Sequence, residues 1–248
     1  MEWTDEAIVL TARRHGESAA IVTLLTREHG RHAGLVPGGR GRRARGVYEP
    51  GNQVLVTWRA RLEEHLGHFA CELVGANAAR VLDDPLRLAG LAAAAAVAEA
   101  ALPEREPHPR AYAGMLELVS ALCDPAVAET AWAASYVRWE LALLAELGFG
   151  LDLRECAATG GNDHLVYVSP KPGRAVSAAA GEPYRDRLLA LPAFLAGDGP
   201  PDLRQVLAGL ALTGHFLGRD VFSHGPRPRA GEPAARARLV AMLRRQAL

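Results

Sequence analysis

Residues 27–61 read REHGRHAGLVPGGRGRRARGVYEPGNQVLVTWRAR, with short apolar runs at both ends and a middle rich in glycine and arginine. No acidic residue lies between Glu28 and Glu49. A segment with this composition cannot form a hydrophobic core, and its glycines favour turns over regular elements. The stretch therefore predicts a mobile, cationic loop that connects two strands.

Short apolar or β-branched runs precede and follow this loop, and turn-forming residues separate them. In residues 53–61, alternation places Val54, Val56 and Trp58 on one face and Arg59 and Arg61 on the other. Five such strands within 75 residues, with a long loop after the third, predict an OB-fold barrel. The predicted strands cover residues 4–13, 19–27, 30–37, 53–61 and 65–74.

From residue 76 the pattern becomes helical, so the chain is predicted to be α+β: an OB-fold domain over residues 1–75 and a mainly α-helical domain over residues 76–248. Asp84-Pro85 is a typical helix start, and Asp124-Pro125 is predicted to open the longest helix. Two apolar runs around the turn Pro170–Gly173 predict a small inserted β-hairpin. The predicted helices cover residues 86–101, 111–122, 125–147, 183–189, 192–195, 203–217 and 233–246.

The formal net charge is zero, but the charges are unevenly distributed. Residues 1–61 carry a net charge of +4, residues 62–218 carry −9 and residues 219–248 carry +5. Only Lys171 is a lysine, and abundant Ala, Gly and Pro indicate a GC-rich genome, so the clustering of arginine is stronger evidence than its amount. A second arginine cluster near the C-terminus could join the first on one face; it comprises Arg227, Arg229, Arg236 and Arg238.

The three cysteines, Cys71, Cys123 and Cys156, are an odd number and lie far apart. This spacing argues against a disulfide framework and against a four-cysteine zinc site. The N-terminal residues lack a basic segment before an apolar run, and no uncharged apolar run reaches about 18 residues. We therefore expect a cytoplasmic protein without a membrane partner.

The arginine-rich loop is the first candidate functional site. Arginines placed along a phosphate backbone release counterions and bind in a salt-dependent way, and aromatic rings can stack on the bases of a single strand. Tyr48, Trp3, Trp58 and Phe69 are the aromatic candidates. Two alternatives stay open: Trp58, in register with the valines, is a core residue, and the loop is a solvated turn.

Metal-binding and catalytic patterns are weak. Cys156 and His164 are isolated, because Thr159 stands where a CxxC pair would need its second thiolate. Ser169 lacks a G-x-S-x-G context, and residues 38–41 lack the Lys-Ser/Thr end of a P-loop. His215 is expected to pack or cap. No catalytic residue is nominated, so the protein is predicted not to be an enzyme.

An aromatic stripe at helical spacing is the last candidate. Trp132, Tyr136, Trp139 and Leu143 recur at three and four residues, and Arg138 lies beside them. Such a stripe is usually core. The alternative is an apolar groove rimmed by arginine, which would suit an acidic and hydrophobic peptide tail.

Several segments together resemble the RecO family of bacterial recombination mediators, and their order and number make the resemblance specific. They run from residue 7 to about residue 222, and the VSPKPGRAVS segment resembles the alphaproteobacterial branch. The matching segments are AIVLTARRHGE (7–17), LLTREHGRHAGLVPGGR (24–40), YEPGN (48–52), YVRWELALLAELGFGLDL (136–153), CAATGG (156–161), LVYVSPKPGRAVS (165–177), PYRDRLLALPAFL (183–195) and HFLGRDVF (215–222).

This resemblance implies an N-terminal OB domain and a helical domain. It also implies binding of single- and double-stranded DNA, strand annealing, and loading of RecA together with RecR and the C-terminal tail of the single-strand DNA-binding protein. Many relatives carry a four-cysteine zinc module, but only Cys156 stands in that region, about residues 150–182, so no zinc or other cofactor is expected. The arginines expected to contact DNA are Arg27, Arg31, Arg40, Arg42, Arg43, Arg45, Arg59 and Arg61.

Three other functions remain open from the sequence. An RNA-binding OB protein would favour RNA over DNA of equal length. A purely protein-binding adaptor would show little salt-sensitive DNA binding. A hydrolase working at the Ser169 hairpin would need a base that the sequence does not identify. We expect the arginines on the flanking strands to have fixed positions and Arg40 to Arg45 to be poorly ordered before DNA binds.

Overall fold

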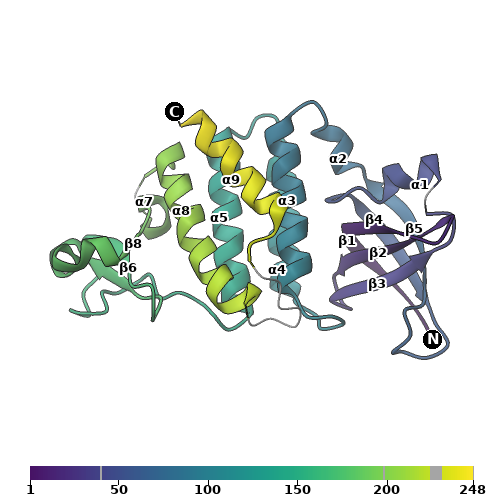
Figure 1. Cartoon of the computed structure of the whole chain (residues 1–248), viewed down its shortest axis with the longest axis horizontal. Coiled ribbons are helices and arrows are strands. Elements are labelled where there is room, and N and C mark those ends of the chain that lie inside the picture. The colour runs from purple at the N-terminus through teal and green to yellow at the C-terminus, as the bar shows by residue number, and fades with distance from the viewer. Residues whose placement is uncertain (40, 198, 224–230, 248) are drawn as a thin grey trace. The chain divides into compact units, whose positions relative to one another are not determined.

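The structure is a computed structural model that describes residues 1–39, 41–197, 199–223 and 231–247 (Figure 1). It contains two compact units, which are described separately. The first unit comprises Met1–Asp124 with Pro233–Leu239, and the second comprises Pro125–Glu232 with Val240–Leu248.

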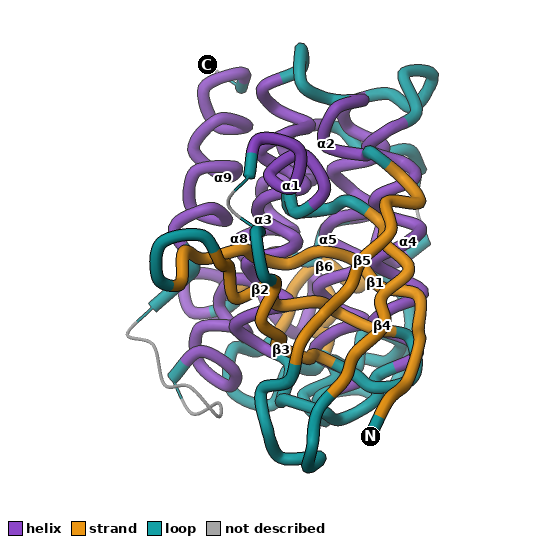
Figure 2. The backbone as a smooth tube through the Cα atoms, turned by 90° about the vertical axis from the view of Figure 1, so that its right-hand side faces the viewer, coloured by secondary structure: helices purple, strands orange, loops and turns teal. Residues whose placement is uncertain are grey.

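Five strands of the first unit close into a barrel in the neighbour order β1-β2-β3-β5-β4 (Figure 2). The β3–β5 pair is parallel, whereas the other pairs are antiparallel. This five-stranded closed sheet is the predicted OB-type barrel, so the fold prediction is confirmed. The strands are β1 (Glu2–His15), β2 (Ala19–Thr26), β3 (Arg31–Val36), β4 (Gln53–Arg59) and β5 (His68–Gly75).

The barrel interior is filled by the alternating side chains of these strands. Val54, Val56 and Trp58 are each at most 1% exposed, as expected for the inward face of β4. Gly34 leaves room for an aromatic ring, because a Cβ there would lie 2.6 Å from the Phe69 side chain. Trp58 is thus a core residue. The interior cluster also contains Ala7, Val9, Ala20, Val22, Leu24, Val36 and Tyr48.

β1 contains a β-bulge that changes which of its side chains face inward. Val9 pairs with Leu24, but the next paired residue, Thr11, lies opposite Thr23, so Leu10 is the extra residue. Before the bulge Ala7 and Val9 are interior residues. Beyond it, inward positions fall on even-numbered residues of β1 rather than on odd-numbered ones, because residues directly opposite each other share a face.

Three helices follow the barrel within the first unit: α2 (Asn77–Arg80), α3 (Pro85–Ala101) and α4 (Pro109–Cys123). The predicted start of α3 is confirmed, because the Asp84 side chain accepts hydrogen bonds from the backbone amides of Leu86 and Arg87 at 3.0 Å each. The strands end at Gly75, where the sequence pattern changes, but these helices belong to the same compact unit as the barrel.

The longest helix, α5 (Glu129–Glu146), begins later than the sequence predicted. Asp124 caps the end of α4, and Arg87 donates hydrogen bonds to the carbonyl oxygens of Leu122 at 2.8 Å and Asp124 at 2.7 Å. The Asp-Pro pair at 124–125 therefore ends one helix instead of opening the next.

In the second unit, α5 packs against α8 (Leu203–Phe216), and the predicted hairpin is present as β6 (Leu165–Val168) and β7 (Ala175–Ser177). A third strand, β8 (Leu189–Ala190), pairs with β6. It replaces the end of the helix predicted over residues 183–189, because β6 offers a free edge. The other elements are α6 (Ala178–Gly181), the 3-10 helix η1 (Glu182–Arg187), α7 (Ala193–Ala196), the π-helix η2 (Leu217–Phe222) and α9 (Ala234–Gln246), of which α9 contributes to both units.

None of the helices in the described ranges is long and apolar enough to cross a membrane.

Candidate nucleic-acid interface

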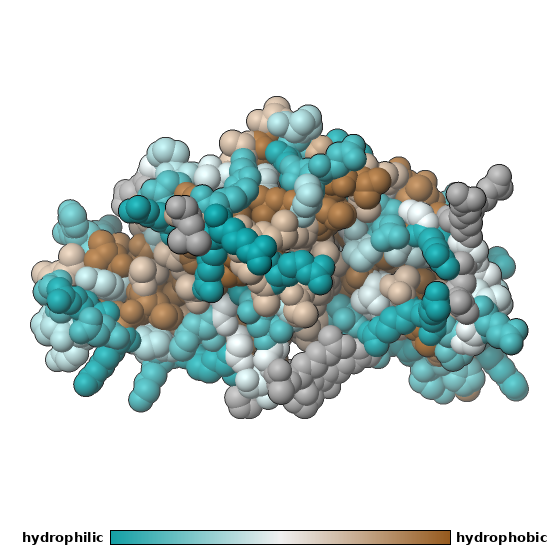
Figure 3. Space-filling view, turned by 45° about the horizontal axis from the view of Figure 1, so that its top comes forward, coloured by the Kyte–Doolittle hydropathy of each residue, from teal (hydrophilic) through white to brown (hydrophobic). Residues whose placement is uncertain are grey.

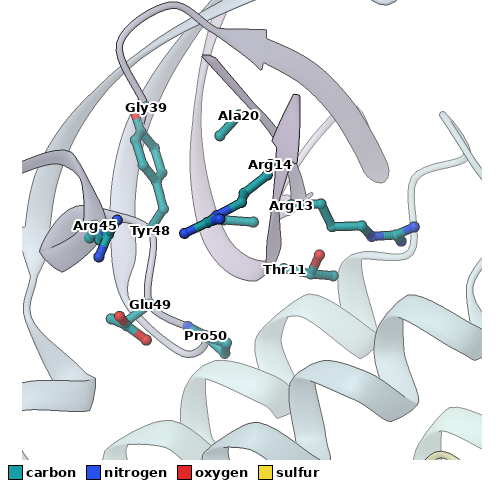
Figure 4. A pocket seen from close by; sticks show the side chains of 10 residues that line it. Thr11, Arg13, Arg14, Ala20, Gly39, Arg45, Tyr48, Glu49 and Pro50 are labelled. Atoms are coloured by element: carbon teal, nitrogen blue, oxygen red, sulfur yellow. The ribbon is translucent and has the colours of Figure 1, made fainter. Parts of the chain in front are cut away.

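A cavity of about 350 Å³ opens at the end of the barrel that carries the short helix α1 (Arg42–Val47). Arg14, near the end of β1, points into this cavity toward Arg45 of α1 (Figure 4). The inward direction of Arg14 follows from the bulge, since Arg14 lies opposite the interior residue Ala20. We call this the cationic mouth; the lining residues used below are Thr11, Arg14, Arg45, Tyr48 and Glu49.

Arg14 and Arg45 outnumber the one carboxylate that lines the cationic mouth, that of Glu49, so these side chains leave it positively charged. Arg14 and Arg45 are exposed, and neither forms an ion pair with another residue in the described part of the chain. The Thr11 hydroxyl is buried and faces outward, opposite Thr23, so it is not counted among the anion contacts. Figure 3, which turns the top of Figure 1 forward, shows hydrophilic side chains beside hydrophobic ones on the right, where the barrel lies.

The arginine-rich segment differs from the predicted mobile loop, because its second half is helical. Ala44 and Val47 pack against the barrel core, which gives α1 an apolar side. The Asn52 side chain donates hydrogen bonds to the carbonyl oxygens of Gly46 at 2.8 Å and Val47 at 3.2 Å, which satisfies the end of the helix. These contacts tie the backbone of α1 to the barrel, and the expectation that Arg40 to Arg45 are poorly ordered before DNA binds stays a prediction.

Three further arginines belong to this segment. Arg42 and Arg43 belong to α1, the helix that presents Arg45 to the cavity. Arg40 lies outside the described residues. All three stay predictions as DNA contacts.

Tyr48 was expected to stack on a base, but its side chain is only 7% exposed and belongs to the barrel core. Burial, followed by interaction with Cys71, raises the pKa of the Tyr48 hydroxyl above its ordinary value. Tyr48 therefore stays neutral and forms the wall of the cationic mouth rather than an open stacking surface.

Arg13, next to Arg14, points the opposite way and pairs with Glu99 of α3. Glu99 is only 6% exposed, so Arg13 compensates a carboxylate that is buried on the helix. Sequence reasoning did not select Arg14 as a site residue. The signal was the arginine pair beside the β1–β2 turn, since strand alternation must send one of the two side chains toward the barrel mouth.

The outer face of β1 and β2 is occupied by protein. Ile8, Leu10 and Leu25 are at most 2% exposed although they are outside the interior cluster, and α3 contacts both strands. Figure 1 shows α3 beside this side of the barrel. Of strands 2 and 3, whose face often holds nucleic acid in OB-folds, β2 is thus in part covered by the chain's own helix.

Arg31 on β3 is a correction to the predicted set of DNA contacts. It is 2% exposed, donates through Nε to the Leu102 carbonyl oxygen at 2.7 Å, and pairs with Glu104 at 3.2 Å. The guanidinium joins β3 to the connection between α3 and α4. A group enclosed in this way cannot reach a phosphate, so Arg31 has a structural role.

Arg27, Arg59 and Arg61 are exposed, as a DNA contact requires. Two of them have acidic partners: Arg27 lies 3.3 Å from Glu6, and Arg59 lies 2.8 Å from Glu2. These pairs neutralise much of the positive charge along β1 and β4. The three arginines stay predictions as DNA contacts, but the surface around them is far less cationic than the mouth beside α1.

The remaining aromatic candidates gather at the opposite end of the barrel. Trp3 is partly buried, and its ring lies 5.6 Å from that of Trp58 and 6.3 Å from that of Phe69. Trp58 donates from Nε1 to the Leu66 carbonyl oxygen at 3.0 Å. Gly67 permits this approach, because its φ is +65° and a Cβ there would lie 2.2 Å from the indole nitrogen.

Cys156 lies in a tight turn of the second unit. The Ser177 amide donates a hydrogen bond to its Sγ at 3.3 Å, and hydrogen bonds from Thr159 and Ser177 lower the pKa of the Cys156 thiol to about 6. Among the described residues, no group of three or more His, Cys, Asp or Glu side chains is placed to hold a metal ion. The local hydrogen bonds give Cys156 a structural role in this turn.

Ser169 and His215 do not form a catalytic pair. Ser169 belongs to the hairpin turn, where its backbone amide donates to the Arg174 carbonyl oxygen at 2.9 Å. The His215 Nε2 donates to the Pro170 carbonyl oxygen at 3.1 Å. Arg219 donates to the Lys171 carbonyl oxygen at 2.8 Å, so both basic side chains fix the hairpin turn.

The aromatic stripe on α5 is core, since Trp132, Tyr136 and Trp139 are at most 4% exposed. Arg138 lies over the Phe194 ring at 5.1 Å from its centroid. In the C-terminal arginine cluster, Arg236 is buried and Arg238 is exposed. The other two members, Arg227 and Arg229, lie outside the described residues.

Comparison with known families places these features in context. The family model described as Recombination protein O N terminal matches residues 1–76, and the model described as Recombination protein O C terminal matches residues 82–226. A protein named DNA repair protein RecO from Rhodospirillum centenum is 59% identical over 242 residues, which cover 97% of this chain and 94% of that protein. Proteins of the same name from Methylobacterium nodulans and Rhodospirillum rubrum are 55% and 50% identical, with 97% or more of each chain covered.

Proposed function

The chain belongs to the RecO family of DNA repair proteins, and from this premise we propose that it binds DNA at the cationic mouth and anneals complementary strands without covalent chemistry. The observation that carries the proposal is the convergence of Arg14 and Arg45 on one open cavity. Neither guanidinium is neutralised by an ion pair with a described residue. Both are therefore available to phosphate oxygens.

The proposed mechanism is electrostatic. Each arginine that neutralises a phosphate releases condensed counterions, which drives binding at low salt. Two strands gathered at arginine-rich surfaces of the same protein repel each other less, so complementary bases meet more often. Arg42 and Arg43 extend the cationic segment along α1, and Arg27, Arg59 and Arg61 are secondary candidates on the barrel. No step of this mechanism requires a nucleophile, a cofactor or zinc.

The resemblance to recombination mediators supports a place for this activity in the cell. We propose that the protein works in the cytoplasm at the nucleoid, together with RecR and the C-terminal tail of the single-strand DNA-binding protein, to load RecA on coated single strands. The DNA repair names of the relatives support this role.

The test compares two double variants that remove the same charge. Arg14→Ala with Arg45→Ala empties the cationic mouth, whereas Arg27→Ala with Arg59→Ala removes two arginines that are already paired with acids. The first variant should anneal complementary oligonucleotides more slowly. Its single-strand salt slope should become shallower by about 1.4, because each phosphate contact contributes about 0.7. The second variant should stay close to the wild type in both measurements.

Three results would contradict the proposal. If the wild-type protein does not change the rate at which complementary oligonucleotides anneal, the proposed function is wrong. An unchanged salt slope in the Arg14/Arg45 variant would move the site away from the cationic mouth. Tighter binding of RNA than of DNA of equal length would favour an RNA-binding role.

A further inference from the structure

A second cavity, of about 320 Å³, opens at the other end of the barrel, where the N-terminus lies (Figure 1). Aromatic rings form its walls, and one of them belongs to a buried histidine whose nitrogens are not satisfied. We call this the aromatic mouth; the groups used below are the rings of Trp3, His29, His32 and Trp58, the carboxylates of Glu2, Glu28 and Glu63, the Met1 amine and the guanidinium of Arg105.

His32 is the feature that points to a ligand. Its side chain is 4% exposed, and neither ring nitrogen has a hydrogen-bond partner among the described residues. Buried polar groups in native proteins almost always have a partner, because an unsatisfied one costs its desolvation energy. Burial, followed by the charges of Arg105 and His29, lowers the pKa of His32 to about 4. The ring is thus neutral near pH 7, with one nitrogen that donates and one that accepts.

The rings around His32 form a rigid stacking surface. Trp3 lies flat on His29, with ring centroids 4.0 Å apart and planes 8° apart. His29 is fixed in turn by Asp5, whose carboxylate lies 2.9 Å from Nδ1. Trp3 and Trp58 contact the His32 ring edge-on, at 5.2 Å and 5.1 Å. Trp58 is buried and stacks offset on Trp3, so the part of the partly exposed Trp3 ring that neither His29 nor Trp58 covers is the surface left for a flat aromatic ligand.

The polar groups at the aromatic mouth favour a neutral ligand over an ion. The three carboxylates are opposed by the Met1 amine and Arg105, and Glu2 is already paired with Arg59 at 2.8 Å. Arg105 is held by the Glu63 and His65 carbonyl oxygens, the latter at 2.8 Å. Donors and acceptors of near-balanced charge match the edge of a nucleobase, which offers both kinds of group.

We infer that the aromatic mouth accepts an unstacked nucleobase of a bound single strand, which stacks on the partly exposed Trp3 ring and hydrogen-bonds to His32. This inference rests on the proposed function, because the strand itself is held by its phosphates. OB-folds contact about 4 to 16 nucleotides of single strand, and β1 carries residues of both mouths.

The test uses two single-stranded oligomers of equal length and charge, one of thymidine nucleotides and one in which every site is abasic. The wild-type protein should bind the base-containing oligomer about 5- to 150-fold more tightly, which is the range expected for one stacked base. His32→Phe keeps a buried ring but removes both nitrogens, and Trp3→Ala removes the stacking surface. In both variants the ratio of the affinities for the base-containing and the abasic oligomer should fall toward one, while the affinity for the abasic oligomer is retained.

A direct signal comes from the ¹⁵N resonances of the His32 ring. They should shift when the base-containing oligomer is added and should stay in place with the abasic one. Tyr184→Ala is the matched control, because this tyrosine is a 60% exposed aromatic residue of the second unit. Its loss should leave the preference for bases unchanged.

The outcomes separate the two proposals. If the wild-type protein shows no salt-dependent binding of the abasic oligomer, this result counts against the proposed function. Equal binding of both oligomers would overturn the base pocket while leaving the proposed function intact. A preference that survives in His32→Phe and Trp3→Ala, or that falls in Tyr184→Ala, would also overturn the base pocket.

Discussion

The two mouths of the barrel are built on the same strand but have opposite chemistry. Trp3 lies near the start of β1 and Arg14 near its end, roughly 35 Å apart along the strand at about 3.3 Å per residue. At the cationic mouth, Arg14 and Arg45 converge without described acidic partners. At the aromatic mouth, stacked rings surround a buried neutral histidine, and acids balance the cations.

Under the proposed function, the two ends of the barrel divide the recognition of a nucleic acid between them. α3 packs on the outer face of β1 and β2, whereas both ends of the barrel open into cavities. Charge at one end suits phosphates, which are the same in every nucleotide. Flat rings and a neutral imidazole at the other end suit a base.

The largest effect should come from Arg31, which supports the aromatic mouth from outside. Arg31→Ala removes the bonds to Leu102 and Glu104 and leaves the buried Leu102 carbonyl oxygen without this charged donor, so the free energy of unfolding should fall by about 3 kcal/mol. Urea unfolding measures the loss, with Arg45→Ala as the control at the cationic mouth. A loss no greater than that of the control would show that Arg31 does not support this end of the barrel.

Acid should weaken the aromatic mouth through His32. Its folded-state pKa of about 4 lies below the ordinary 6.5, so below pH 6.5 the unfolded state binds a proton that the folded state excludes. The stabilisation is complete above pH 6.5 and is lost as the pH falls toward 4, by about 3 kcal/mol in total. His32→Phe should lack this part of the pH dependence. If the free energies of unfolding of the variant and the wild type fall in parallel between pH 6.5 and 4, the prediction that His32 causes this pH dependence is wrong.

At the cationic end, Arg13 and Arg14 should separate stability from binding. Arg13→Ala leaves Glu99 buried without this partner, and because Arg13 is half exposed the free energy of unfolding should fall by only about 1 kcal/mol. Arg14→Ala should leave the unfolding midpoint unchanged and weaken single-strand binding. Thermal unfolding and an oligonucleotide titration of both variants check this. The reverse result would mean that the bulge does not direct the two side chains as described.

The smallest effect should come from the paired arginines between the mouths. Arg27→Ala and Arg59→Ala each remove a guanidinium that lies on the surface beside a glutamate, so single-strand affinity should change by less than about twofold. Fluorescence anisotropy at fixed salt measures it. A tenfold loss in either variant would place the main phosphate contacts on this face rather than at the cationic mouth.

Much of the fold could be predicted because alternation and turn residues are local signals. Val54, Val56 and Trp58 were predicted to share a face and do fill the interior. The hairpin around residues 170–173 was predicted in the same way, and Asp84 caps α3 as expected. The predicted start of α5 was wrong because an Asp-Pro pair can end a helix as well as begin one. Here Asp124-Pro125 ends α4, and Arg87 donates a hydrogen bond to the Asp124 carbonyl oxygen at that end.

The candidate site could be predicted only in part. Composition located the arginine-rich segment and led to Arg45, but composition does not distinguish an enclosed arginine from an exposed one. Arg31 is enclosed because the connection between α3 and α4, some 70 residues further along the chain, closes over it. The helix α1 formed where a loop was predicted, because Ala44, Val47 and Asn52 tie it to the barrel.

The sequence by itself determined that this chain forms a five-stranded barrel with arginines beside the β1–β2 turn. Only the tertiary structure decided which of them faces the open mouth. The early alternation of β1, continued without interruption, would send Arg13 inward and Arg14 toward α3. The bulge at Leu10 shifts the phase by one residue, because β1 must bend to pair with β4 over its first half and with β2 over its second. That single extra residue directs Arg13 to Glu99 and leaves Arg14 free at the cationic mouth.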